Sequence, residues 1–135
     1  MNADTKIKPA AGPWIALGAV CSGLSVMLGA LGAHALKDRL VEKKLATFHT
    51  ATDYLGYHGL ALVLVGLLMM VTGEAAYRKS ALWFTAGLVL FSGSLYILAF
   101  DGPRFFGPVT PLGGLSFMIG WFTLAFTAAR KRKDG

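Results

Sequence analysis

Four apolar stretches of about twenty residues, each free of Asp, Glu, Lys and Arg, occupy most of this 135-residue sequence. They cover residues 14–36, 54–73, 81–100 and 110–129. An α-helix rises about 1.5 Å per residue, so about twenty residues cross the roughly 30 Å hydrocarbon core of a bilayer. Backbone polar groups in lipid must be paired within the protein, and each stretch should therefore be helical. The sequence predicts an all-α integral membrane protein, a four-transmembrane-helix bundle.

The connections between the stretches are short, which leaves room for only one domain. We expect a single transmembrane domain over 14–129, with an N-terminal tail at 1–13 and a basic C-terminal tail at 130–135. The first apolar run is longer than the 7–15 residues of a signal peptide, so we interpret it as a retained span. Charged residues make up 15% of the sequence, below the roughly 25% that is typical of soluble domains.

The Lys and Arg residues predict an orientation. Four spans place both termini on one side, and that side holds eight of the 13 basic residues: Lys6, Lys8, Arg78, Lys79, Arg130, Lys131, Arg132 and Lys133. The positive-inside bias therefore predicts a multi-pass plasma-membrane protein with both termini in the cytoplasm. The net charge of +6 comes from helix ends and tails, without the basic–aromatic surface pattern of nucleic-acid binding, so we expect no nucleic-acid partner.

Residues 37–53 carry an amphipathic pattern ahead of the second span. Val41, Leu45, Phe48, Thr52 and Leu55 recur at spacings of three and four, which indicates one face of a helix. A single helix from 41 to 71 would be about 46 Å long, more than a bilayer core needs. We therefore expect a short interfacial amphipathic segment between the first two spans, lying in the headgroup layer or bent away from the second span.

Small residues form narrow seams on the first and fourth spans. In lipid such residues mark where helix backbones approach each other. The seams predict close helix packing, with the first and fourth helices well buried. The packing positions are Gly18, Ser22, Ser25, Gly29 and Gly32 on the first span, and Gly113, Ser116 and Gly120 on the fourth.

Polar side chains gather toward the predicted outer half of the bundle. We expect His58, about one turn inside the second span, to be buried, because an imidazole facing hydrocarbon would leave its polar nitrogens unpaired. An ionisable group within a membrane is also a functional candidate. Neighbouring span ends should bring other polar groups to its depth, although a register-fixing hydrogen-bond network would explain them equally well. The candidate pocket comprises His34, Tyr54, His58, Ser92, Ser94, Tyr96 and Thr110.

Sharper chemistries receive little support from the sequence. His34, His49 and His58 are the candidates for a metal, and His34 with His58 for an axial haem pair. The spacing of the histidines matches no dedicated motif, so we expect neither metal nor cofactor. Proton-coupled transport needs a carboxylate within the membrane, and Asp53, the nearest one, falls at a predicted interface. No nucleophile or paired-carboxylate motif lies at membrane depth, and we expect no enzymatic activity.

Four segments together resemble a known family. They are Gly29–His34, Phe48–Ala61, Leu90–Tyr96, and Thr110–Gly114 followed by Gly120 and Trp121. The chain from about Trp14 to Ala129 is similar to the small membrane proteins grouped as domain of unknown function 423, also called the UPF0382 or transmembrane protein 256 family. The resemblance implies four membrane helices, with bacterial members in the plasma membrane. It implies no reaction.

Two classes of function follow. The first is a non-catalytic structural or modulatory membrane component. Its partners would be the bilayer and either a membrane-protein complex or a second copy of this chain. The alternative is a binder or carrier of a small molecule, lipid or metal in the outer-half His/Tyr/Ser pocket. The short loops and the small-residue seams favour the first class, and the polar cluster favours the second.

Overall fold

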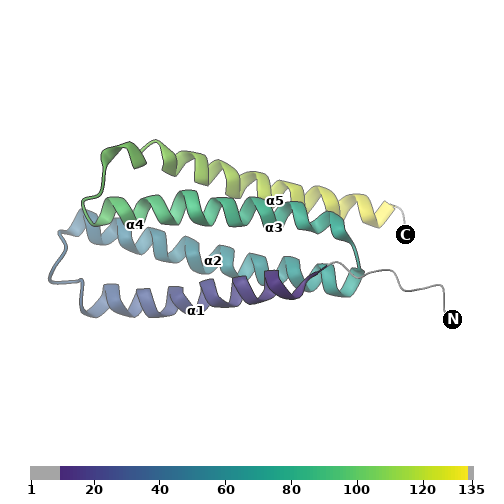
Figure 1. The fold of residues 1–135 in the computed structure, drawn as a ribbon, viewed down its shortest axis with the longest axis horizontal. Coiled ribbons are helices and arrows are strands. Elements are labelled where there is room, and N and C mark those ends of the chain that lie inside the picture. Colours follow the sequence, from purple (N-terminus) through teal and green to yellow (C-terminus); the bar gives the residue numbers. More distant parts are fainter. Residues whose placement is uncertain (1–9, 134–135) are drawn as a thin grey trace.

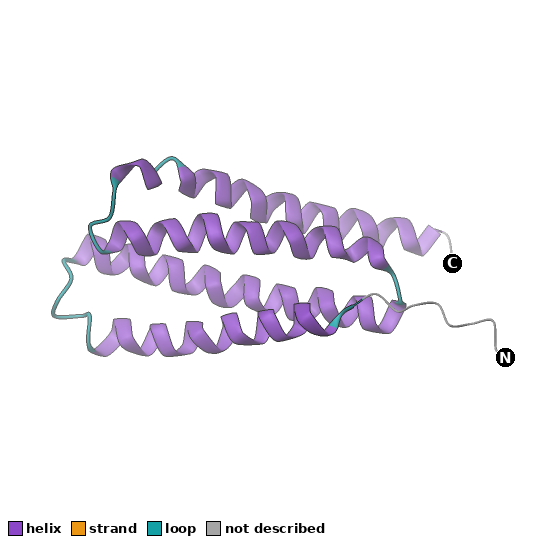
Figure 2. Cartoon of the chain, viewed as in Figure 1, coloured by secondary structure: helices purple, strands orange, loops and turns teal. Residues whose placement is uncertain are grey.

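The computed structural model describes residues 10–133, which are helical apart from short connections. The elements are α1 (Gly12–His34), α2 (Glu42–Thr72), η1 (Ala75–Tyr77), α3 (Arg78–Gly87), η2 (Leu88–Gly93), α4 (Ser94–Ala99), η3 (Arg104–Phe106) and α5 (Val109–Lys133). The segments from η1 to α4 run on as one rod, called the third span below (Figure 2). Four helices are thus long and apolar enough to cross a membrane, which confirms the predicted fold class.

The structure describes only part of the two predicted tails. Residues 1–9, with Lys6 and Lys8, and residues 134–135 lie outside the described part of the chain. At the other end, α5 continues to Lys133, so the basic run that follows the fourth span begins as helix. Helix propensity allows this extension, because Arg and Lys are good helix formers.

The helices follow one another across the molecule, with α1 and α5 at opposite edges and α2 and the third span between them (Figure 1). Only 11% of the most apolar part of α1 is buried, against 39% for α2 and 22% for α5. The expectation that the first and fourth helices are well buried is therefore wrong. A seam of small residues buries one narrow strip of a helix, and the remaining faces of α1 and α5 are left to lipid.

The seam on α1 packs against α2 at very short range. A Cβ atom added to Gly18 would lie 2.4 Å from the carbonyl oxygen of Gly59, so only glycine fits there. Gly32 lies against Phe48, and the hydroxyl of Ser25 lies over Gly56. Gly29 has more room, because its nearest neighbour is a methyl group of Thr52 at 4.0 Å. These contacts lie along the predicted packing positions of α1, and Gly29 is the one with the most space around it.

The seam on α5 packs against the third span. A Cβ atom at Gly113 would lie 2.3 Å from the backbone nitrogen of Phe91, and one at Gly120 would lie 2.7 Å from the ring of Phe84. Between them, Ser116 Oγ donates a hydrogen bond of 2.7 Å to the carbonyl oxygen of Trp83. Phe91 belongs to η2, a π-helical segment inside the third span. Widened turns of this kind often occur at functional sites, and this one lies against α5.

The amphipathic stretch forms the first turns of α2 and continues straight into the second span. Phe48 is buried there against the rings of Tyr96 and Phe100 at the end of the third span. These turns are therefore held by contacts with the third span and belong to α2 instead of forming a separate segment. Beyond them, Lys44 forms an ion pair with Asp101 in the loop that leads to α5.

Candidate functional site

His58 is a buried ionisable side chain whose two ring nitrogens both have hydrogen-bond partners. It is 4% exposed and lies on α2 among Tyr54, Phe84, Phe117 and Trp121, which together we call the His58 cluster. Its ring stacks on Phe117 with centroids 3.5 Å apart and an angle of 12° between the planes. The cluster thus joins three helices, because Phe84 comes from α3 and Phe117 and Trp121 come from α5.

Both ring nitrogens of His58 have hydrogen-bond partners. The indole N–H of Trp121 lies 3.1 Å from Nε2, and an indole nitrogen can only donate, so Nε2 is the acceptor. The proton of the neutral ring is therefore on Nδ1, which donates to the carbonyl oxygen of Tyr54 at 3.0 Å. With both nitrogens occupied, the ring has no free lone pair for a metal ion or for general-base chemistry.

The cluster lies at the middle of the bundle rather than one turn inside the membrane. Trp121 is the central residue of α5, and Gly59, next to His58, contacts Ser22 near the centre of α1. The predicted position of His58 was too close to the end of the bundle that carries the α1–α2 loop, called the loop end below. The error arose because the second span was taken to start at residue 54, whereas α2 begins at Glu42. The contacts between α1 and α2 instead align residues 48–66 of α2 with residues 11–32 of α1.

The other predicted pocket residues form separate pairs instead of one pocket with His58. Tyr96 shares a hydrogen bond of 2.8 Å with Thr52, and Ser92 donates one of 2.9 Å to the carbonyl oxygen of Ala51. Ser94 and Thr110 share a third, of 2.6 Å, between α4 and α5. Each of these bonds links two different helices. Of the predicted set, only Tyr54 contacts His58, with ring centroids 5.7 Å apart.

The three histidines lie apart. His34 is exposed at the end of α1, His49 lies over Gly32, and His58 is at the centre of the bundle. Within residues 10–133, no three side chains of His, Cys, Asp or Glu come together as a metal site would require. The arrangement favours a structural interpretation of these polar groups, because each buried one is committed to a neighbouring helix.

Phe84, Phe117 and Trp121 complete the cluster, and sequence reasoning assigned them no role. A signal for Trp121 was available. An indole N–H inside a membrane needs an acceptor, and a histidine on a neighbouring span is a suitable one. Phe84 and Phe117 gave no such signal, since an apolar ring within a span fits lipid and protein equally well.

Four membrane-spanning helices, tied together by polar pairs inside the bundle, define a small multi-pass membrane protein. Residues 28–114 match the family model described as "Protein of unknown function (DUF423)", and the chain belongs to this family. Membership confirms the resemblance carried by the four sequence segments. No solved structure matches the chain significantly.

Curated relatives match more than four fifths of this chain. A UPF0382 membrane protein of Staphylococcus haemolyticus is 43% identical over 82% of this chain and 90% of its own length. The UPF0382 membrane protein YwdK of Bacillus subtilis is 40% identical over 87% of this chain and 96% of its own. The UPF0382 inner membrane protein YgdD of Escherichia coli is 34% identical over 87% of this chain and 89% of its own length.

Proposed function

We propose that this protein is a non-catalytic structural or modulatory component of the plasma membrane, which acts through contacts of its outer helix faces. The hydrogen bonding of His58 carries the proposal. Its two nitrogens are taken by Trp121 and Tyr54, so the residue with the strongest claim to chemistry serves the packing of the bundle. Ser92, Ser116 and the Tyr96–Thr52 pair are committed to neighbouring helices in the same way.

The outer face of α1 is the surface that this proposal assigns to partners. Most of α1 faces away from the bundle, and Val20 on that face is 58% exposed. Apolar surface gives no drive to associate in lipid, so a partner there is held by close packing of small residues. Ala19 and Gly23 lie on this exposed side, and nothing within 4 Å would meet a Cβ atom at Gly23.

The proposal also includes a location in the plasma membrane and an orientation with both termini in the cytoplasm. The relative from Escherichia coli is named an inner membrane protein, which supports the plasma membrane. The excess of Lys and Arg at the end of the bundle where α1 begins and α5 ends supports cytoplasmic termini. The alternative, a ligand bound in the outer-half His/Tyr/Ser pocket, has less support, since most of those groups form hydrogen bonds to neighbouring helices at separate places.

A photo-crosslinking amino acid at Val20, in cells that make the full-length protein, tests the proposal. We expect it to form a discrete adduct with a second protein or with another copy of this chain. The matched control places the same amino acid at Ala61, which is 3% exposed on α2 and should crosslink only within the bundle. Adducts with lipid alone at Val20, together with a stoichiometric metal or chromophore lost in a His58→Leu variant, would overturn the proposal.

A further inference from the structure

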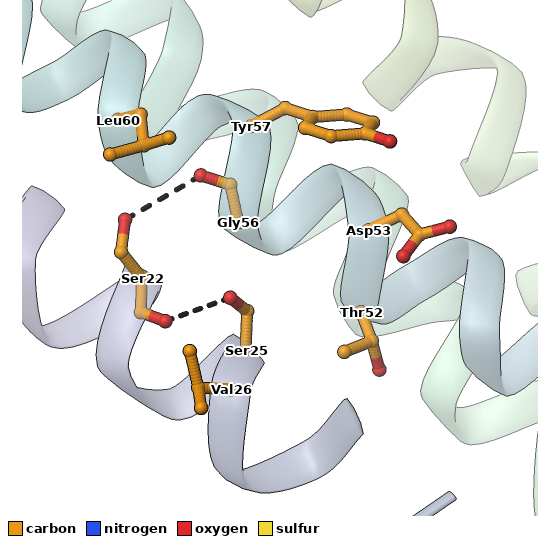
Figure 3. A pocket seen from close by; sticks show the side chains of 8 residues that line it. All are labelled: Ser22, Ser25, Val26, Thr52, Asp53, Gly56, Tyr57 and Leu60. Carbon is orange, nitrogen blue, oxygen red and sulfur yellow. Dashed lines mark hydrogen bonds between the residues drawn. The ribbon is translucent and has the colours of Figure 1, made fainter. Parts of the chain in front are cut away.

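A groove with a volume of about 350 Å³ lies between α1 and α2 and extends from the middle of the bundle toward the loop that joins them. Figure 3 shows the side chains that line it. The groove shares no residue with the His58 cluster. The groove contains polar groups from both helices and opens beside exposed side chains. Its lining residues are Ser22, Ser25, Val26, Thr52, Asp53, Gly56, Tyr57 and Leu60.

The contacts between α1 and α2 set the depth of Asp53 in the bundle. Thr52 is the nearest neighbour of Gly29, and Gly56 lies against Ser25, so Asp53 is level with residues 26–28 of α1. From that level α1 continues to His34, which is roughly 9–12 Å farther along the helix axis. Asp53 is therefore level with a part of α1 about two turns inside its loop end, which is deeper than the interface position predicted from the sequence.

Within the described part of the chain this carboxylate makes no hydrogen bond or ion pair. Asp53 is exposed. The ion pair found among the described residues joins Lys44 to Asp101 at the loop end and does not include Asp53. His49 is one helical turn away on α2, but its ring lies over Gly32 of α1 and makes no ion pair with Asp53. An ionisable group at this depth is expensive in lipid unless a partner or ligand accompanies it.

The surroundings of Asp53 suit a particular shape of ligand. Figure 3 shows the Asp53 carboxylate and the Tyr57 hydroxyl extending in the same direction from neighbouring turns of α2. A carboxylate accepts charge-assisted hydrogen bonds from an ammonium group, and an aromatic ring attracts a cation. Val26 and Leu60 supply apolar walls farther along the groove. The combination fits one cationic head on an apolar body.

We propose that this groove binds the primary ammonium group of an amphipathic amine that enters from the lipid. The ammonium donates to Asp53 and lies beside the ring of Tyr57, while the apolar body follows Val26 and Leu60. A single carboxylate with neutral hydroxyls is too few charges for a divalent cation, which takes several oxygen ligands. The amine could be a free amphiphile or the ethanolamine head of a phospholipid.

The test uses the full-length protein in phosphatidylcholine nanodiscs with radiolabelled dodecylamine, and empty nanodiscs correct for partitioning. We expect saturable binding, which Asp53→Asn weakens by about tenfold or more, because hydrogen bonds to charged groups are the stronger class. Asp38→Asn is the matched control, since it removes the same charge from an exposed residue of the α1–α2 loop. Unlabelled dodecanol, with the same chain and no charge, should not compete.

A second variant separates loss of the site from loss of the fold. Val26→Trp fills the groove, leaves Asp53 intact and should also abolish binding, while circular dichroism shows unchanged helicity. Equal affinity in wild type and Asp53→Asn, full binding by Val26→Trp, or competition by dodecanol would each overturn the proposal. Adding phosphatidylethanolamine identifies the source of the amine: competition supports a lipid head, and no competition supports a free amphiphile.

Discussion

The indole N–H of Trp121 donates a hydrogen bond of 3.1 Å to Nε2 of His58, which joins α5 to α2 at the centre of the bundle. Trp121 itself is 41% exposed, so one side of its ring faces outward while its nitrogen reaches a buried acceptor. This geometry fixes the rotation of α5 about its axis, because only one helix face can present the indole to His58.

Replacing Trp121 with Phe should lower the free energy of unfolding, since His58 Nε2 would be buried without a donor. Hydrogen bonds between membrane helices are worth about 0.6 kcal/mol on average and up to roughly 1.7. Trp83→Phe is the matched control: Trp83 is also 41% exposed, and its indole makes no hydrogen bond within the described residues. Reversible unfolding in mixed micelles measures both, and equal losses would contradict the structural role of the bond.

Two glycines of α1 should respond in opposite ways to alanine. Gly18→Ala should destabilise the bundle, because the new methyl group would lie 2.4 Å from a backbone oxygen of α2. Gly23→Ala should be neutral or stabilising, because its surroundings are open and alanine favours helix by up to about 1 kcal/mol in water. Thermal unfolding in detergent compares the two, and a similar effect at both positions would show that close contact does not govern α1.

Two buried serines of the third span should also differ. Ser80 is 0% exposed, and its hydroxyl is buried without a partner within residues 10–133, so Ser80→Ala should preserve or raise stability. Ser92 is 1% exposed and donates to Ala51 of α2, so Ser92→Ala should lower it. The same unfolding assay applies. A loss at Ser80 as large as that at Ser92 would point to an unseen partner of the Ser80 hydroxyl.

Asp101 combines an ion pair with an unusual backbone conformation. Its φ of 61° lies in the left-handed region, which favours glycine. Asp101→Gly and Asp101→Ala both remove the pair with Lys44, but only glycine relieves the strain of the left-handed backbone. The glycine variant should therefore be more stable than the alanine variant by about 1 kcal/mol. Because the pair is exposed, high salt should lower the stability of wild type and leave both variants nearly unchanged.

The number and type of spans could be predicted from the sequence, and the depth of individual residues could not. A long apolar segment in lipid can pair its backbone N–H and C=O groups only as a helix, so the stretches around Leu24 and Leu67 had to be helical. Depth depends on how neighbouring helices are aligned. The contact of Gly18 with Gly59 sets that alignment, and it places His58 at the centre of the bundle and Asp53 level with residues 26–28 of α1.

The candidate pocket shows the same limit. Its polar residues were grouped because the span ends that carry them meet at one end of the bundle. Which helix faces meet depends on side-chain packing, and this brings Tyr96 to Thr52 and Ser94 to Thr110 instead of bringing both to His58. The small residues were better guides, because a missing Cβ atom restricts where a neighbouring backbone can pass.

The orientation of the bundle gives the last prediction. In the sequence, eight of the 13 basic residues precede the first span, join the second span to the third or follow the fourth, and five fall in the other two connections. A reporter active only in the cytoplasm should therefore be active when fused after Ala129, and one active only outside should be active within 101–107. Replacing Lys43 and Lys44 with Gln should strengthen this pattern, since it removes positive charge from the external side. The reverse activities would place the Asp53 groove in the inner leaflet, where an amine would have to enter from the cytoplasm.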